Sequence, residues 1–440
     1  MALQKQHLDD YLTIETGKLA AACTACGKCV EVCPVTPFTG TAPEDGPAVI
    51  GGLLSLLKDG GPMEPAARAW SDQCNGCGIC IPACPEAVNP RRLVMLAQTA
   101  EARQGSATPQ LFRKMSRAIR IMAAMQLAPE EYGRLLRVPR ARPAPVVFYL
   151  GCNPIRTPHL LFNAMVILDA LEVDYQVLGG PGACCGIIHA KWQGDMAQGE
   201  RVVDGTLDRF ADQRPERVLS WCPSCLLHLG ETLQEFRATS FAFDHITDLL
   251  AERSAELARK FLQPIERRAL LHVHDGMAGI GDNVAGLLRA IPGLTLVEMM
   301  AEPGYTCGGS GADRSPALKA ERRAALLERA AADDVDVLVT LYHGCHAQLA
   351  ATEARGDFEV LNWTDLLVQA LGQQPHDDIS KRYRMRDDWD LVLDEGESYL
   401  RANGVAVDRD WLKGLLPEIF AQAEFTGGLE AFANTDRGAP

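Results

Sequence analysis

The chain has 440 residues, of which 47% are hydrophobic and 23% are charged, as is typical of a globular protein with two to four domains. Its formal net charge of −14 argues against nucleic acid as a partner, because phosphate binding needs a basic surface. We expect no transmembrane segment and no signal peptide, because the sequence has neither an apolar run of 18 residues nor an apolar N-terminal stretch. Fifteen cysteines in metal-type spacings then predict a reducing, cytoplasmic location.

Two cysteine runs of one form follow a predicted helix over residues 1–22. They read CTACGKCVEVCP, from Cys23 to Pro34, and CNGCGICIPACP, from Cys74 to Pro85. Both are the C-x2-C-x2-C-x3-C-P run of two-cluster ferredoxins, in which the fourth cysteine of each run ligates the other cluster. Zinc knuckles are a weaker interpretation, because both copies are complete and both end in proline. We therefore predict two [4Fe–4S] cubanes, one held by Cys23, Cys26, Cys29 and Cys84 and the other by Cys74, Cys77, Cys80 and Cys33.

Helices are predicted between and after these runs, so residues 1–105 are interpreted as an α-helical ferredoxin domain. Residues 106–143 continue as a helical linker that ends in a proline-rich stretch, VPRARPAP, from Val138 to Pro145. The linker is basic, and this basic face indicates either a solvated surface, which we favour, or a contact with a partner or with lipid headgroups. Its cationic residues are Arg113, Lys114, Arg117, Arg120, Arg134, Arg137, Arg140 and Arg142.

Residues 144–262 are predicted to form an α/β domain in which cysteines follow three strands. The strands are predicted at residues 146–150, 175–178 and 217–221. Because ligands bind at the carboxyl ends of strands in open α/β sheets, this placement predicts one shared site. Glycines beside the cysteines, Gly151 and Gly186, would let backbone come close to an inorganic core. The cysteines of this site are Cys152, Cys184, Cys185, Cys222 and Cys225.

The same pattern recurs over residues 263–372, about 120 residues later, which predicts a duplicated α/β domain. Strands are expected at residues 269–273, 294–298 and 336–340, and the exits ITDLL and WTDLL correspond. This second copy has lost most cysteines and is degenerate. A zinc or mixed site is one interpretation, and a vestigial site or a pocket is favoured over it. Its candidate ligands are Cys307, Cys345, His274, His343 and His346. Residues 373–440 are predicted to be a helical extension that packs on this copy.

The cysteine pattern resembles the cysteine-rich (CCG) domain of the catalytic (D-type) subunits of heterodisulfide reductase. It is also similar to the iron–sulfur subunits of glycolate oxidase and of anaerobic glycerol-3-phosphate dehydrogenase. In the heterodisulfide reductase branch, a complete five-cysteine set holds a noncubane [4Fe–4S] cluster, and the resemblance implies such a cluster here. The second copy departs from the family pattern at Met277, Thr306 and Tyr342, so a second noncubane cluster is not expected. An ordinary cubane with one spare structural cysteine is the alternative for the first copy.

Thirteen of the fifteen cysteines are thus assigned to clusters, and no catalytic triad, P-loop or dinucleotide fingerprint accompanies them. We predict an oxidoreductase subunit whose two cubanes feed a five-cysteine cluster that performs disulfide/thiol chemistry. A pure electron relay from a flavin dehydrogenase of a small hydroxy acid towards quinone is the second hypothesis, and a metal-stabilised scaffold without turnover is the third. A flavoprotein or other redox subunit is the expected partner, with a membrane cytochrome or quinone-reactive subunit as a further possibility at the inner face of the membrane.

Overall fold

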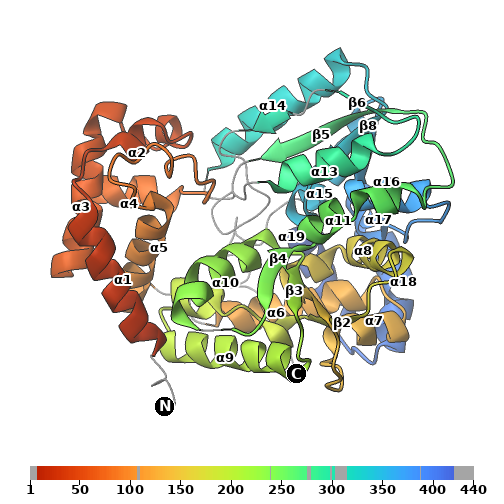
Figure 1. Ribbon diagram of the computed structural model, residues 1–440, viewed down its shortest axis with the longest axis horizontal. Helices are drawn as coiled ribbons and strands as arrows, with labels where there is room; N and C mark the ends of the chain where they lie inside the picture. Colours follow the sequence, from red (N-terminus) through yellow and green to blue (C-terminus); the bar gives the residue numbers. More distant parts are fainter. Residues whose placement is uncertain are drawn as a thin grey trace.

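Helices surround two small parallel sheets in the computed structural model of the chain (Figure 1). None of the helices in the described part of the chain is both long and apolar enough to cross a membrane. The structure describes residues 7–106, 110–237, 239–274, 279–297, 300–302, 315–386 and 388–420.

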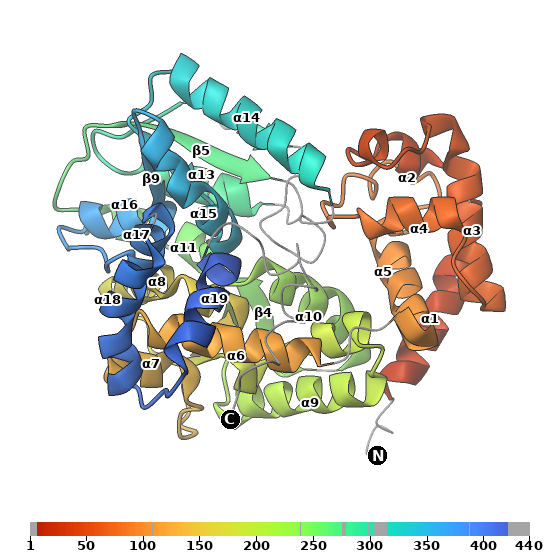
Figure 2. The ribbon, with the colours of Figure 1, turned by 180° about the vertical axis from the view of Figure 1, so that it is seen from behind.

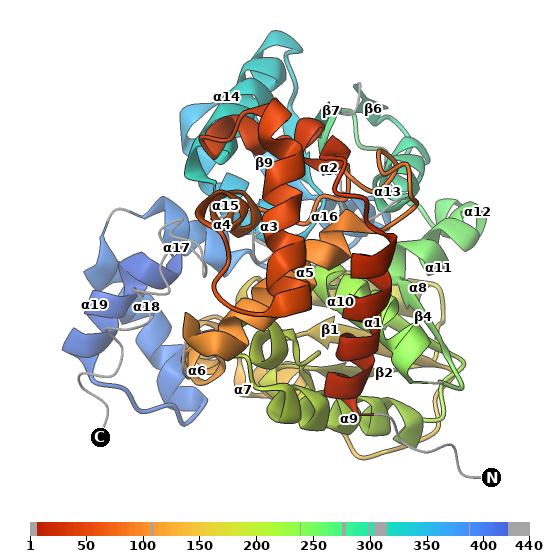
Figure 3. The same cartoon turned by 90° about the vertical axis from the view of Figure 1, so that its left-hand side faces the viewer.

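The cysteine runs lie in an N-terminal helical lobe, with α1 and α3 nearest the viewer in Figure 3. Proline occupies the first turn of α4 and α5, where a missing N–H costs no helical hydrogen bond. The lobe has a core of its own around Leu53 and the buried Trp70, whose Nε1 donates to Thr36 Oγ1 at 3.0 Å. This core fixes the loops that carry both runs. The helices are α1 (Leu8–Ala22), α2 (Lys28–Glu31), α3 (Gly46–Asp59), α4 (Pro65–Asp72) and α5 (Pro90–Glu101).

The first α/β unit contains a four-stranded sheet of order β2-β1-β3-β4, with every pair parallel. All six residues of β1 are buried, which explains why it reads as a continuous apolar run. The chain leaves β1 for β2 on one side and returns to β3 on the other, so the strand order reverses between β1 and β3. Such a switch point forms a crevice at the carboxyl ends of the strands. The elements are β1 (Val146–Gly151), α8 (Pro158–Ala170), β2 (Tyr175–Gly179), α9 (Met196–Asp212), β3 (Arg217–Ser220), α10 (Pro223–Phe236), β4 (Ala242–His245), α11 (Ile246–Glu252) and α12 (Ser254–Ala258).

The second α/β unit repeats this topology in the order β6-β5-β8-β9. The single strand expected over residues 294–298 is wrong in detail, because two short strands, β6 and β7, both pair with β5. Neither β4 nor β9 was predicted from the sequence. The elements are β5 (Arg268–His274), α13 (Ile280–Arg289), β6 (Thr295–Leu296), β7 (Met300–Glu302), α14 (Pro316–Ala332), β8 (Val337–Thr340), α15 (His343–Leu349), β9 (Glu359–Asn362) and α16 (Trp363–Ala370).

The two α/β units pack through matching elements, α8 on α16 and α11 on α13. Asn163 Nδ2 on α8 donates to Asp365 Oδ1 at 2.6 Å, and Asn283 Nδ2 on α13 donates to Asp248 Oδ1 at 2.8 Å. Both aspartates belong to the repeated TDLL exits. The repeat therefore places equivalent residues in equivalent contacts, which supports a duplication.

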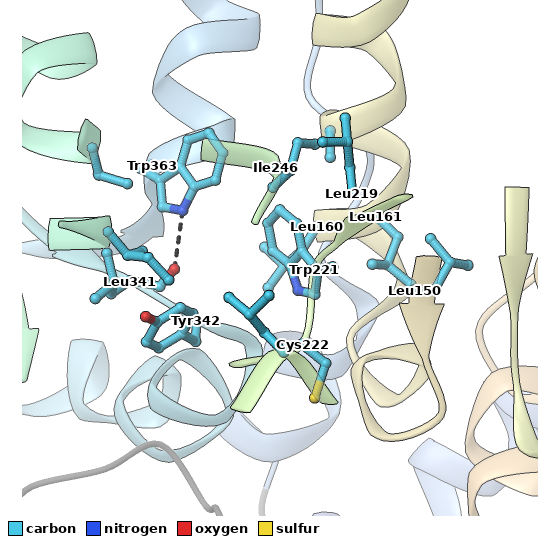
Figure 4. Close-up of a cluster of buried hydrophobic side chains, with 14 of the residues drawn as sticks. Leu150, Leu160, Leu161, Leu219, Trp221, Cys222, Ile246, Leu341, Tyr342 and Trp363 are labelled. Atoms are coloured by element: carbon cyan, nitrogen blue, oxygen red, sulfur yellow. Dashed lines mark hydrogen bonds between the residues drawn. The ribbon is translucent and has the colours of Figure 1, made fainter. Parts of the chain in front are cut away.

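Two buried tryptophans meet where the units join. Trp221, directly after β3, stacks on Trp363 at the start of α16, with ring centroids 5.7 Å apart (Figure 4). Trp363 Nε1 donates to the carbonyl of Leu341 at 3.0 Å, drawn as the dashed line in Figure 4. The contact lies immediately before Cys222 and so links its position to the second unit.

The C-terminal helices pack largely on the linker. Buried side chains of α6 share a core with α17, α18 and α19, and Figure 2 shows α19 beside α6. Asn403 Nδ2 donates to the carbonyl of Leu127 at 2.7 Å, and Tyr383 Oη donates to that of Met125 at 3.0 Å. The expectation that the extension packs on the second α/β copy therefore needs correction, although α17 does contact that copy. The helices are α6 (Leu111–Ala124), α7 (Pro129–Leu136), α17 (Ile379–Met385), α18 (Trp389–Ala402) and α19 (Arg409–Phe420).

Candidate metal centres

The five cysteines of the first α/β unit form one continuous group of thiols. Each thiol lies beside the next one in the group: Cys184 lies beside Cys152 and Cys185, and Cys225 lies beside Cys185 and Cys222. All five are buried, with exposed fractions of 8% or less. They follow β1, β2 and β3, so they lie at the switch point of the sheet. The structure thus brings together the residues that strand-end reasoning predicted would meet.

Protonation is uneven within this group. Hydrogen bonding in which the Cys184 thiol is the donor to Cys152 and Cys185, together with burial, raises the pKa of Cys184 well above its ordinary value. Hydrogen bonds from Cys184 and Cys225 hold the pKa of Cys185 well below its ordinary value, and the nearby His228 acts in the same direction. A thiolate flanked by thiols is the donor arrangement that binds a soft metal centre, since the thiolate is the form that coordinates.

Glycine stands at two closely packed positions beside these thiols. Gly151 has φ +72°, and a Cβ there would lie 3.0 Å from Cys222 Cβ and 3.1 Å from Cys225 Sγ. Gly186 has φ +79°, and its N–H points at Cys184 Sγ with an N···S distance of 3.4 Å. Any larger residue at either position would be strained and would intrude on its neighbours. Close backbone approach, predicted for both glycines, is therefore observed; their role at a cluster stays a prediction.

Residues that the sequence analysis did not single out hold the cysteine loops. Thr206 Oγ1 donates to the carbonyl of Cys184 at 2.8 Å, and Ser220 Oγ donates to that of Cys222 at 3.1 Å. The hydroxyl of the fully buried Tyr149 donates to the carbonyl of Ala183 at 2.9 Å. Burial, with a smaller contribution from the neighbouring cysteines, raises the pKa of Tyr149 well above 10, so its hydroxyl stays a donor. The one sequence signal for this role of Tyr149 was that it is a polar residue in an otherwise apolar strand.

The eight cysteines of the N-terminal lobe interleave across the two runs. Burial raises the pKa of Cys29 to about 12, with further contributions from Cys23, Cys26 and Cys84. Burial also raises the pKa of Cys33 to about 11, with the next contribution from Cys74. Cys84 thus lies near Cys29 of the first run, and Cys33 lies near Cys74 of the second, as the crossed assignment requires. Which cluster each thiol ligates stays a prediction.

Turns with positive φ shape both runs. Gly27 has φ +78°, and a Cβ there would come within 2.6 Å of Pro47, so the first run needs glycine at this point. Gly78 takes the same conformation in the second run. Pro34 and Pro85 each follow the last cysteine of a run inside a turn, where the N–H groups of Thr36 and Ala87 bond back to Cys33 and Cys84.

Comparisons with known proteins agree with this geometry. A model of the cysteine-rich domain, CCG, matches residues 146–230 and again residues 272–350. A model of the 4Fe–4S binding domain, Fer4_4, matches residues 20–37 and 71–89. The chain carries a 4Fe–4S binding domain and two CCG domains. This confirms the predicted fold class, a helical ferredoxin-type region followed by two tandem α/β CCG domains.

Two relatives extend the similarity along most of the chain. The B-type subunit of fumarate reductase (CoM/CoB) of Methanothermobacter marburgensis is 23% identical over 389 residues, which cover 84% of this chain and 75% of that protein. The D-type subunit of dihydromethanophenazine:CoB–CoM heterodisulfide reductase of Methanosarcina barkeri is 22% identical over 393 residues, covering 80% and 94% respectively. The chain is thus an iron–sulfur electron-transfer protein related to heterodisulfide reductase.

The 4Fe–4S binding domain contacts the first CCG domain beside its cysteines. Helix α5 begins shortly after Cys84 and packs on η6 (Ile188–Trp192), a helical turn that begins two residues after Gly186. At the far end of α5, a Cβ on Gly194 would lie 2.9 Å from the backbone of Ala102. The packing of α5 on η6 therefore lies between the cysteine runs of the N-terminal lobe and the five cysteines of the first CCG domain.

The second CCG domain differs in what surrounds Cys345, the cysteine of this domain that the structure describes. Cys345 is fully buried and accepts the N–H of Tyr342 at 3.3 Å. His343 lies close to Cys345 and to Arg156, and burial lowers the pKa of His343 to about 3. His346, also predicted near the cysteines, instead makes its ring contacts with Thr340 and Asp378. Cys307, Met277 and Thr306 lie outside the described residues, as does the side chain of His274.

Proposed function

We propose that the chain is the iron–sulfur subunit of a redox complex in which two cubanes exchange electrons with a five-cysteine noncubane [4Fe–4S] cluster that acts on a disulfide/thiol pair. The observation that carries the proposal is the continuous group of five buried thiols at the switch point of the first CCG sheet. A cubane needs four thiolates, so a fifth in the same group favours a larger or more open core.

The donor sets fit such groups. Eight thiols in two interleaved sets suit two cubanes, with Cys84 beside Cys29 and Cys33 beside Cys74. The five-thiol group is lined by hydroxyl donors that bond carbonyls of the cysteine loops, which fixes the ligands before any cluster is bound. When bound, iron–sulfur clusters supply one-electron transfer, and reducing one disulfide to two thiols takes two electrons and two protons.

Electrons would enter through the 4Fe–4S binding domain and cross where α5 packs on η6. A flavoprotein or other redox subunit is the proposed partner, because both relatives are named as subunits of reductases. A membrane cytochrome or quinone-reactive subunit remains the proposed route to a membrane.

Burial of the thiols favours a second candidate, the pure relay. Cys184 and Cys185 are only 1% and 3% exposed, so a disulfide substrate needs a path to them that surface thiols would not require. In the relay, the same three clusters would pass electrons from a flavin dehydrogenase towards quinone, and no thiol would form.

Disulfide turnover by the full chain separates the two candidates. The anaerobically reduced protein is mixed with a small disulfide, and released thiol is measured together with reoxidation of the clusters. We expect thiol release from the wild type and its loss in Cys185→Ser, with Cys345→Ser as a control that removes a buried cysteine outside the group. Cluster reoxidation by a one-electron acceptor with no thiol release from any disulfide would favour the relay.

A further inference from the structure

Two histidines and an aspartate from three distant segments meet away from the cysteine sites. His159 lies on α8 of the first CCG domain, His346 on α15 of the second, and Asp378 directly before α17 of the C-terminal extension. One side-chain donor atom from each lies within 4.8 Å of the other two. The site therefore joins the parts of the chain that the CCG domains and the extension contribute.

The donor atoms lie close to the positions that a small divalent cation would require. His159 Nδ1 lies 3.3 Å from Asp378 Oδ1, and His346 Nε2 lies 2.6 Å from Asp378 Oδ2. In a tetrahedral zinc site with bonds of about 2.0–2.1 Å, neighbouring ligand atoms are separated by about 3.3 Å. A shift of under 1 Å at His346 would reach that separation.

Hydrogen bonding fixes which nitrogen of His346 faces the aspartate. Thr340 Oγ1 donates to the carbonyl of Leu361 at 3.2 Å, so it accepts from His346 Nδ1–H at 3.0 Å. In the neutral ring, His346 Nε2 then directs a lone pair at a carboxylate, which is repulsive unless both atoms bind one cation. Such an outer hydrogen bond is the usual support of a metal-binding histidine. A protonated His346 paired with Asp378 is the competing interpretation.

His159 distinguishes the two interpretations. Its side chain is 1% exposed, and neither ring nitrogen has a hydrogen-bond partner among the described residues. A buried polar group left unsatisfied carries a free-energy cost. The ion pair of His346 with Asp378 leaves this cost in place, whereas a metal ion on Nδ1 removes part of it. Burial lowers the pKa of His159 to about 3, so the ring is neutral and able to coordinate.

Neighbouring groups orient the carboxylate of Asp378, and the basic side chains close to it bond other oxygen atoms instead. The backbone N–H of Lys381 donates to Asp378 Oδ1 at 2.8 Å. Lys381 Nζ turns instead to Glu353 Oε2 at 2.9 Å, and Arg384 Nη1 donates to the carbonyl of Phe420 at 2.6 Å. Asp378 also lines a cavity of about 500 Å³ with His376 and Lys381, which gives an ion and a water ligand access to the site.

We propose that His159, His346 and Asp378 bind one divalent transition-metal ion of the zinc type, with water as the fourth ligand. Nitrogen and carboxylate donors without thiolate suit zinc in a three-ligand site. The ion ties α8, α15 and α17 together and fixes the extension on both CCG domains. This site is distinct from the zinc or mixed site considered around Cys345, since the two sites have only His346 in common.

The test uses the full-length protein, purified without oxygen and supplied with Zn²⁺. Metal analysis and zinc X-ray absorption are compared for the wild type, His159→Gln and Asp378→Asn. His376→Gln is the matched control, because His376 lies two residues from Asp378 yet bonds Glu131 Oε1 at 2.8 Å. We expect one zinc with an oxygen and nitrogen shell at about 2.0–2.1 Å in the wild type and control, and its loss in the other two with iron unchanged.

Two results would overturn the proposal. One is that the wild type binds no more zinc than His159→Gln, which would favour the ion pair of His346 with Asp378. The other is zinc with sulfur ligands at about 2.3 Å that persists in His159→Gln, which places it on cysteines. Iron content reports whether the variants fold. If they do not, Co²⁺ bound to the wild type decides, since a spectrum dominated by sulfur-to-cobalt charge transfer, or no bound cobalt, contradicts the site.

Discussion

Replacing Gly151 with alanine probes the packing of the five-thiol group with one added carbon. The residue has φ +72°, a conformation that costs an L-residue about 1–2 kcal/mol. The new Cβ would also lie 3.0 Å from Cys222 Cβ and 3.1 Å from Cys225 Sγ. Overpacking of this kind costs about 1–3 kcal/mol. The two terms give a destabilisation of about 2–5 kcal/mol, concentrated at the ends of β1 and β3.

Native-state hydrogen exchange measures this cost locally, because the chain has several domains and its global unfolding is not two-state. Exchange over β1 and β3 should accelerate by the factor that corresponds to 2–5 kcal/mol, about 30-fold or more. The signal of the five-cysteine cluster should weaken, and the iron of the two cubanes should be retained. Gly404→Ala is the control, since Gly404 has φ +68° with no atom within 4 Å of an added Cβ. Unchanged exchange and an unchanged cluster signal in Gly151→Ala would refute the packing argument.

Three further predictions concern other parts of the chain. Cys33→Ser should damage the cluster of Cys74, Cys77 and Cys80 and spare the other cluster, because Cys33 lies near Cys74. Electron paramagnetic resonance checks this, and loss of the cluster of Cys23, Cys26 and Cys29 instead would mean that each run closes its own cube. Burial lowers the pKa of His245 to about 4, so the unfolded chain binds a proton that the folded chain does not between pH 4 and 6.5. Stability is therefore present above pH 6.5 and lost as the pH falls, by up to about 3 kcal/mol, and His245→Gln should reduce this pH dependence in native-state hydrogen exchange over β4 and α11. Cys307→Ala should leave the iron content unchanged, since Cys307 and Cys345 are too few thiolates for a second noncubane cluster; a loss of several irons per chain would contradict this.

The cysteine sites were predictable because their signals are local. Each cysteine group of the first CCG domain follows a strand, and parallel strands bring their carboxyl ends to one edge. The apolar run at Val146–Gly151 identified β1 because β1 is buried on both faces. The repeated TDLL exits likewise indicated a duplication before Asp248 and Asp365 were seen in matching contacts.

Other features depend on partners that the sequence does not name. Strands β4 and β9 are four residues long and mix polar with apolar residues, so their neighbours β3 and β8 define them more than their own pattern does. A helical extension was predicted and α18 and α19 belong to it, yet an apolar helix face does not say that its partner is α6. His159 and Asp378 gave no signal because their meeting depends on how the CCG domains and the extension pack.

The most direct test of the central claim is single Cys→Ser replacement at all five positions of the group, followed by iron analysis and electron paramagnetic resonance of the oxidised protein with and without added thiol. The positions are Cys152, Cys184, Cys185, Cys222 and Cys225. If one noncubane cluster is held by five thiolates, each replacement should alter the same signal and leave the cubane signals intact, and added thiol should perturb that signal in the wild type. One replacement that leaves both the signal and the iron count unaltered would contradict the five-thiolate site and indicate an ordinary cubane with a spare cysteine.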